Sequence, residues 1–197
     1  MIASKGDIRR DIRARRRSLT SREQKRASRQ LAAVLNRWKP WRRARHVALY
    51  LPNDGEPDLT PLARAAWRDG KQVYLPVLAG RGGNHLWFRR YTPGSRLIRN
   101  RFDIPEPSAA GTRISPRQLD LVLAPLVAFD ARGHRLGMGG GFYDRTFGFV
   151  HHRPAWQHPR LVGVAHHFQQ LDELPAEPWD VPLTAIATDR GLIRPRA

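Results

Sequence analysis

The chain has 197 residues, of which 41% are hydrophobic and 26% charged, as expected for one globular domain (residues 1–197) with a substantial core. It contains no cysteine, which excludes disulfides, a thiol nucleophile and cysteine-based metal sites. Lys and Arg number 35 against 17 Asp and Glu, and the resulting charge of +18 favours polyanionic partners. Because this charge is spread along the whole chain, it allows anionic ligands without identifying a nucleic-acid surface.

The apolar runs of the sequence are short. None of them reaches the length that spans a bilayer, and residues 1–5 lead into charged sequence without the apolar segment of a signal peptide. We therefore expect a cytoplasmic protein without a membrane partner.

Residues 4–37 are polar and rich in arginine, with apolar residues recurring at helical spacing. This pattern predicts two helices, the second starting at an N-cap formed by Thr20 or Ser21, with Glu23 in its first turn. On the residues alone, the segment is a solvated, charged face over an apolar stripe that packs on the rest of the domain.

Two apolar runs, residues 46–51 and 72–77, are separated by a turn and a helical pattern over residues 59–69 that Gly70 closes. Strand, helix and strand in this order predict a βαβ unit with parallel strands. Ligands of such sheets bind beyond the carboxyl ends of the strands.

Two carboxylates follow the first of these strands. Asp58 is expected to cap the helix after it, whereas Glu56, which precedes a proline at the strand end, is the better candidate for holding a ligand.

Further along, residues 85–91 predict a strand. Residues 92–118 are rich in Pro, Gly and Arg and predict a long ordered loop, of a length that is often functional.

Residues 119–129 form an apolar run typical of a strand buried on both faces. A glycine loop follows directly, with Gly137, Gly139, Gly140 and Gly141, and a helix is expected to start at Phe142. Glycine lets a ligand approach the bare backbone, and successive N–H groups in such a loop form an anion-binding nest. Strand, glycine loop and helix together outline a phosphate cradle.

Four side chains distinguish this loop from an ordinary tight turn. Arg135 precedes the glycines, and Tyr143, Asp144 and Arg145 follow them. The pattern is neither the P-loop nor the dinucleotide fingerprint. The flanking phenol, carboxylate and guanidinium groups nevertheless favour a site.

The remaining segments complete an α/β pattern. Residues 161–165 and 183–188 predict two more strands, so we expect a single-domain, three-layer α/β/α sandwich with a Rossmann-like, largely parallel sheet and helices on both faces. The adjacent histidines at 151–152 and 166–167 lack the spacing of a zinc site, and no Gly-x-Ser-x-Gly elbow indicates a serine hydrolase.

The segment PLVAFDARGHRLGMGGGFYDR, residues 125–145, resembles the signature of the 5-formyltetrahydrofolate cyclo-ligase family, also called methenyltetrahydrofolate synthetases. The similarity covers nearly the whole chain. It includes KGDIR, VALYLPNDGEPD, KQVYLPVL, NRFDIPEP, LVGVAHHFQQL and EPWDVPLTAIAT.

The resemblance implies a reaction. Members of this family use ATP and Mg²⁺ to convert 5-formyltetrahydrofolate into 5,10-methenyltetrahydrofolate, with release of ADP and phosphate. The γ-phosphoryl group passes to the formyl oxygen, N10 attacks the activated carbon, and phosphate leaves as the ring closes. Such a reaction needs phosphate clamps and a pocket that brings N10 close to the formyl carbon.

The resemblance also implies roles for residues. Tyr143 and Arg135 are the expected catalytic residues, and Tyr143 is expected to lie between nucleotide and folate. ATP is assigned to Lys5, Arg9, Arg135, Gly137, Met138, Gly139, Gly140, Gly141, Phe142, Tyr143, Asp144 and Arg145.

For the folate, the resemblance makes Glu56 the acceptor for the pterin N–H groups. Tyr50, Pro52, Phe88 and Tyr143, with the loop at residues 102–107, are expected to wall the same pocket.

For magnesium, the resemblance points to Asp144. Some relatives carry an acidic residue near the last strand where this chain has Thr184, and Asp180 is the substitute candidate.

The expected partners are ATP and a folate. The hypothesis that the positive surface attracts polyglutamylated folates stays open, and a monomer is expected. The alternative function is a basic nucleic-acid-binding protein that retains a nucleotide-binding shell, favoured by the charge of +18 but without a recognisable nucleic-acid module.

Overall fold

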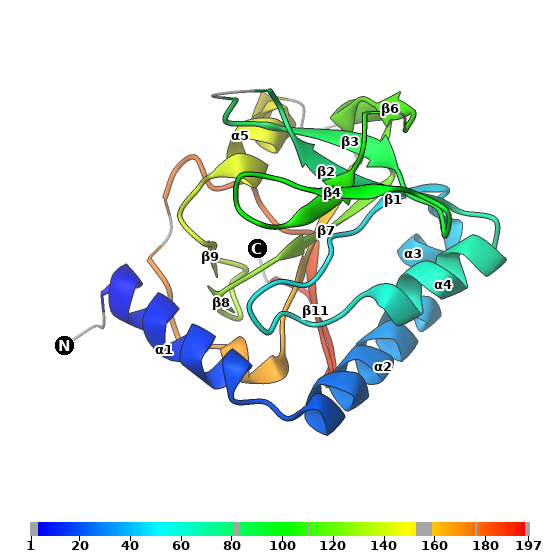
Figure 1. Cartoon of the computed structure of the whole chain (residues 1–197). Helices are drawn as coiled ribbons and strands as arrows, with labels where there is room; N and C mark the ends of the chain where they lie inside the picture. Colours follow the sequence, from blue (N-terminus) through cyan, green and yellow to red (C-terminus); the bar gives the residue numbers. More distant parts are fainter. Residues whose placement is uncertain (1–3, 81–82, 110, 153–158, 176, 196–197) are drawn as a thin grey trace.

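The computed structural model describes residues 4–80, 83–109, 111–152, 159–175 and 177–195 (Figure 1). Its centre is an eight-stranded sheet in the order β12-β11-β10-β7-β1-β2-β3-β6. These strands are β1 (His46–Ala48), β2 (Gln72–Leu78), β3 (Leu86–Arg90), β6 (Arg113–Ile114), β7 (Leu121–Pro125), β10 (Arg160–Val164), β11 (Ala185–Thr188) and β12 (Gly191–Ile193).

The middle of this sheet is parallel. β1 pairs with β2 and β7, and β10 pairs with β7 and β11, all in parallel register. β3, β6 and β12 extend the two margins by antiparallel pairing. The predicted parallel βαβ unit is confirmed, and the carboxyl ends of the parallel strands share one edge of the sheet.

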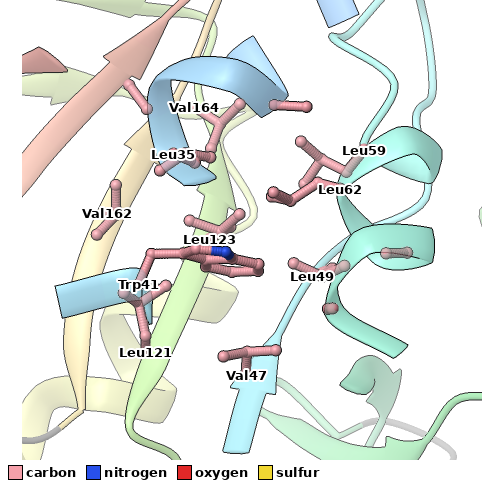
Figure 2. Packing of buried hydrophobic residues seen from close by; sticks show 14 of the residues in the cluster. Leu35, Trp41, Val47, Leu49, Leu59, Leu62, Leu121, Leu123, Val162 and Val164 are labelled. Atoms are coloured by element: carbon pink, nitrogen blue, oxygen red, sulfur yellow. The ribbon is translucent and has the colours of Figure 1, made fainter. Parts of the chain in front are cut away.

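The helices are α1 (Lys5–Arg17), α2 (Ser21–Arg37), α3 (Lys39–Arg43), α4 (Thr60–Arg68) and α5 (Phe142–Phe147). α2, α3 and α4 cover one face of the sheet, where Trp41, Leu35 and Leu62 pack on strand residues such as Leu121 and Val47 (Figure 2). α5 and the 3-10 turn η2 (Gly148–His152) cover the other face. The expected three-layer α/β/α fold is confirmed.

The burial of β7 on both faces explains why the sequence is continuously apolar over this strand. Leu121 and Leu123 point into the cluster beneath α2 to α4, and Val122 points into the cluster beneath α5. All three side chains are fully buried, because successive residues of a strand face opposite sides and both sides are covered.

The two N-terminal helices break where the sequence predicts. Thr20 caps α2 through a reciprocal capping box with Glu23. α2 contributes its apolar stripe to the core, whereas α1 is charged almost throughout and lies beside β8 (Figure 1). Within α1 only Ile12 and Arg16 are buried.

Two expectations about strands are corrected. The run at 119–129 is not one strand: β7 ends at Pro125, whose ring nitrogen cannot donate a ladder hydrogen bond, and β8 (Ala128–Phe129) pairs instead with β9 (Arg135–Leu136). The predicted loop at 92–118 contains β6 and a hairpin of β4 (Leu97–Arg99) and β5 (Pro105–Pro107), followed by η1 (Pro116–Gln118).

The first strand is shorter than predicted, because regular pairing ends at Ala48. Leu49 still donates to the Tyr74 carbonyl at 2.9 Å.

Among the described residues, no helix is both long and apolar enough to cross a membrane.

Candidate active site

The first part of the site is the turn Asp54-Gly55-Glu56, which follows β1 at the carboxyl edge of the sheet. Asp54 and Gly55 adopt positive φ angles of 51° and 75°. A Cβ on Gly55 would come within 2.7 Å of the backbone oxygen of Arg16. Only glycine therefore lets the turn lie against the C-terminal part of α1.

Three arginines of α1 hold Asp54. Arg13 Nε and Arg17 Nε each lie 2.5 Å from a carboxylate oxygen, and Arg16 Nη2 lies 2.9 Å from Oδ2. Burial acts to raise the pKa of Asp54, but the hydrogen bonds from the three guanidinium groups outweigh it and lower the pKa. The carboxylate is thus an ionised anchor for the turn.

Glu56 is the buried carboxylate of the turn. Its Oε2 accepts a hydrogen bond from the Asn53 N–H at 3.1 Å, and its Oε1 lies 3.7 Å from Arg16 Nη1. Burial raises the pKa of Glu56 to about 7, against the opposing effect of the Arg16 charge. A carboxyl group in this state gains from a ligand that donates hydrogen bonds to it.

Two tyrosines lie close to Glu56. Burial raises the pKa of Tyr143, and the nearby Glu56 charge raises it further. Burial likewise raises the pKa of Tyr50, with smaller effects from Glu56 and Tyr143. The Tyr50 hydroxyl donates to the Pro57 carbonyl at 3.1 Å. The structure therefore places the first turn of α5 within electrostatic reach of the turn after β1.

The glycine loop starts from the β8–β9 hairpin. Asp130, fully buried, accepts hydrogen bonds from the N–H groups of Arg132, His134 and Leu174 and pairs with the His134 ring at 2.9 Å. Gly139 and Gly141 have φ angles of 97° and 57°. α5 begins at Phe142 as predicted, but it is only six residues long and has no side-chain cap.

Two of the predicted cations contact this loop. Arg9 Nε donates to the Gly137 carbonyl at 2.8 Å, and Arg145 contacts the carbonyls of Gly140 and Asn84. Lys5 Nζ lies 2.6 Å from Glu177, with both side chains about one-third exposed. Arg9 and Arg145 thus contact the loop directly, whereas Lys5 is held on a carboxylate of the segment before β11.

Arg135 is more deeply set. Its side chain is 7% exposed and contacts both the Asp144 carboxylate and the Val181 carbonyl. Asp144 Oδ1 also accepts from the Val181 N–H at 3.3 Å. Arg135 and Asp144 thus tie β9, α5 and the segment before β11 together.

The carboxylates suit magnesium only if phosphate oxygens complete its shell. The contacts of Asp144 engage Oδ1, which leaves Oδ2 for a metal, and Asp180 Oδ2 accepts from the Glu177 N–H at 3.0 Å. No group of three metal-ligating side chains occurs among the described residues. Mg²⁺ is commonly bound through one or two carboxylates plus substrate phosphates, which fits this arrangement.

Among the predicted pocket walls, Pro52 and Phe102 are exposed, and Phe102 packs edge-on against Phe142 at 5.9 Å between ring centroids. Met138, assigned to the ATP loop, is exposed as well. Phe88 is fully buried and packs on Phe147. Its expected place on the pocket wall is corrected, because the structure puts this ring in the core beneath α5.

A separate hollow of about 500 Å³ lies at the opposite edge of the sheet, at the start of β1 and β2. Its lining includes the cations Arg42, Arg43, Arg45 and Lys71, together with Asp69. Part of the charge noted in the sequence is therefore remote from the glycine loop.

Sequence reasoning missed several side chains that hold the backbone of the Gly55 turn and of the segment after β7. The Gly55 carbonyl accepts from Gln24 Nε2 at 3.1 Å and contacts His166 Nε2 at 3.0 Å. Gln169 Nε2, fully buried, donates to the carbonyls of Leu126 and Val127. Burial lowers the pKa of His166. No spacing in the sequence marks these contacts, because they join four separate segments.

Comparisons with known proteins agree with the sequence resemblance. The model of the 5-formyltetrahydrofolate cyclo-ligase family matches residues 1–189. The chain is 45% identical over 180 residues to the 5-formyltetrahydrofolate cyclo-ligase of Escherichia coli strain K12, covering 90% of this chain and 96% of that protein. It is 41% identical to the enzyme of the same name from Haemophilus influenzae, covering 89% and 92% of the two chains.

Solved structures show the same similarity. The NMR structure of the Aquifex aeolicus 5,10-methenyltetrahydrofolate synthetase matches with a TM-score of 0.81 and 33% identity, covering 98% of this chain and 93% of that one. The synthetase from Mycoplasma pneumoniae, at 24% identity and a TM-score of 0.73, shares the fold.

Proposed function

This chain belongs to the 5-formyltetrahydrofolate cyclo-ligase family, and from that membership we propose that it converts 5-formyltetrahydrofolate into 5,10-methenyltetrahydrofolate with ATP and Mg²⁺. The observation that carries the proposal is that α1 contacts both the Glu56 turn, through Arg16, and the glycine loop, through Arg9, with Tyr143 within reach of the Glu56 charge. A folate and a nucleotide bound on these two sides would have their reacting ends near Tyr143.

α1 supports this division of the site. Arg9, in its first half, contacts the glycine loop, and Arg16, near its end, contacts the Asp54–Glu56 turn. Seven residues of helix separate the two by ~10 Å. One helix thus borders both the phosphate side and the pterin side.

On the pterin side, Glu56 offers a buried carboxylate to the N–H groups of the ring. Charge-assisted hydrogen bonds of this kind are roughly twice as strong as neutral ones, and the buried setting strengthens them. Tyr50, packed beneath the turn with its hydroxyl on the Pro57 carbonyl, keeps the floor of the pocket fixed.

On the phosphate side, Lys5, Arg9, Arg135 and Arg145 supply positive charge, and the glycines leave the backbone open to close approach. Asp144, with Asp180 as a second candidate, would hold magnesium together with phosphate oxygens. Bound there, the metal would spread the charge of the γ-phosphate.

The residues of the site would contribute by positioning the reacting groups of the two substrates. The formyl oxygen takes the γ-phosphoryl group and releases ADP. N10 attacks the formyl carbon and loses its proton, and the former formyl oxygen departs with inorganic phosphate as the ring closes. The hydroxyl of Tyr143, held in its protonated form by burial, would donate to the formyl oxygen and orient it.

The test is formation of methenyl product, followed by its near-ultraviolet absorbance. We expect product that requires both ATP and Mg²⁺, and at least a 10-fold lower kcat in Tyr143→Phe. Tyr74→Phe is the matched control and should turn over normally, because the Tyr74 hydroxyl contacts Gln72 and His46 at the opposite edge of the sheet. Folded wild-type protein without product would overturn the proposed reaction, and equal kcat in both variants would remove Tyr143 from it.

The basic hollow at Arg42, Arg43 and Arg45 favours a second candidate, binding of RNA. Its signature would be salt-dependent, folate-independent binding of a short RNA that weakens in Arg43→Ala. Binding unchanged by that substitution, or absent at moderate salt, would remove it.

A further inference from the structure

Arg16 is an unusual residue in α1. The helix is otherwise charged and largely exposed, yet the Arg16 side chain is 0% exposed and its Nε is buried without a hydrogen-bond partner. Burying a guanidinium is costly unless it is fully paired. A buried arginine at this position therefore indicates a role that an exposed arginine could not have.

Neutralising Asp54 does not require it. Arg13 and Arg17 already contact both oxygens of that carboxylate, each at 2.5 Å. What distinguishes Arg16 is its second amino group. Nη1 lies 3.7 Å from Glu56 Oε1 and 3.4 Å from the Leu126 carbonyl. Among the described residues, Arg16 makes the one ion pair of Glu56.

We propose that Arg16 is a positioning residue of the folate site, which fixes the Asp54–Glu56 turn, aims the Glu56 carboxylate and favours its hydrogen-bond-accepting form. The inference rests on the proposed function, in which Glu56 receives the pterin N–H groups. Arg16 touches neither substrate in this scheme and acts only through Glu56.

The contacts of the turn explain how a single side chain has this effect. Gly55 lies on the Arg16 backbone, and its carbonyl is held from the other side by Gln24 and His166. The guanidinium bridges Asp54 and Glu56 across this pinned glycine. Rotation of either carboxylate would break a contact with Arg16.

The charges around Glu56 explain why its ionisation depends on Arg16. Asp54 in the same turn disfavours the charged form, as does burial, while the phenols of Tyr50 and Tyr143 are neutral and His166, with a lowered pKa, adds no charge above neutral pH. Arg16 is the opposing cation. Without it, the pKa of Glu56 rises further, so that a larger fraction of the carboxyl group is protonated at neutral pH and presents a donor in place of an acceptor.

The test is a double-mutant cycle of Arg16→Met and Glu56→Gln, with KM measured separately for folate and ATP. Arg16→Met should raise the folate KM at least 10-fold at pH 7, change the ATP KM less than threefold, and recover as the pH is raised towards 9. In the Glu56→Gln background it should add no more than twofold. Equal effects in both backgrounds, or on both KM values, would overturn the proposal.

Arg17→Met is the matched control, because it loses a contact with Asp54 but none with Glu56. Its folate KM should stay within threefold of wild type. Arg16→Lys keeps the charge, and it is the variant to measure if Arg16→Met fails to fold. It should raise the folate KM less than tenfold with a pH profile like wild type, and a profile shifted to higher pH would contradict the charge role.

A second readout does not depend on turnover. The side-chain carboxyl signal of Glu56, assigned by its loss in Glu56→Gln, can be titrated by ¹³C NMR. Its midpoint should lie at least one pH unit higher in Arg16→Met than in wild type and Arg17→Met. Identical midpoints would overturn the role of Arg16, whereas absence of methenyl product with shifted midpoints would reject only the proposed reaction.

Discussion

The Asp54–Glu56 turn and the glycine loop are the two sides of the proposed site, and they differ in how firmly the rest of the chain holds them. The turn is held by side chains from α1, α2 and the segment after β10, of which Arg16 and His166 are buried. The glycine loop is held by a few contacts from partly exposed cations to its own carbonyls. The difference suits a rigid pterin on one side and a flexible, hydrated triphosphate on the other.

The glycine loop keeps one firm attachment, the pairing of Arg135 with Asp144 and the Val181 carbonyl. Arg135→Met should lower kcat/KM by ~1000-fold, because it removes a phosphate clamp and releases the proposed metal ligand. Methenyl absorbance checks this. Arg132→Met, which breaks an exposed ion pair with Glu173, should leave turnover unchanged. Full activity in Arg135→Met would mean that the loop works without its anchor.

A comparison of two glycines sharpens the contrast in rigidity. Gly55→Ala should lower the free energy of unfolding by ~3 to 4 kcal/mol, because its Cβ would meet the Arg16 backbone at 2.7 Å in a left-handed conformation. Gly139→Ala should cost ~1 to 2 kcal/mol, because it meets only the flexible end of Arg9 at 3.7 Å. Urea denaturation measures both, and equal losses would contradict the contrast.

The pH dependence of stability tests the burial of Glu56. Its pKa of about 7 in the folded chain lies above the ordinary value of 4.5, so the stability it contributes is complete below pH 4.5 and is lost as the pH rises through 7. Relative to Glu56→Gln, wild type should lose ~2 to 3 kcal/mol of unfolding free energy between pH 4.5 and 8. A constant difference would mean that Glu56 titrates as an exposed carboxyl.

The smallest effect is expected at Lys5. Its ion pair with Glu177 is about one-third exposed on each side, so Lys5→Met should change the unfolding free energy by less than ~0.5 kcal/mol. Its ATP KM should nevertheless rise several-fold at low salt, and less at high salt. An unchanged ATP KM at low salt would exclude Lys5 from the phosphate side.

The two regions also differ in how well the sequence predicts them. The glycine loop and Glu56 follow apolar runs that the period of a strand identifies, so their place at the carboxyl edge is predictable. Arg16 is not, because α1 carries several arginines and only a contact with a turn 38 residues away selects the buried one. Likewise, Pro105 and Pro107 hide the β4–β5 hairpin, whose pairing appears only in three dimensions.

The most direct test is the pair of KM values of Glu56→Gln, measured by methenyl absorbance with folate and ATP varied in turn. Loss of a charge-assisted acceptor should raise the folate KM by roughly 10- to 100-fold and leave the ATP KM within threefold of wild type. Glu173→Gln, on an exposed carboxylate, should change neither. An unchanged folate KM, or an equal rise of both values, would contradict a cleft divided into a firmly held pterin side and an adaptable phosphate side.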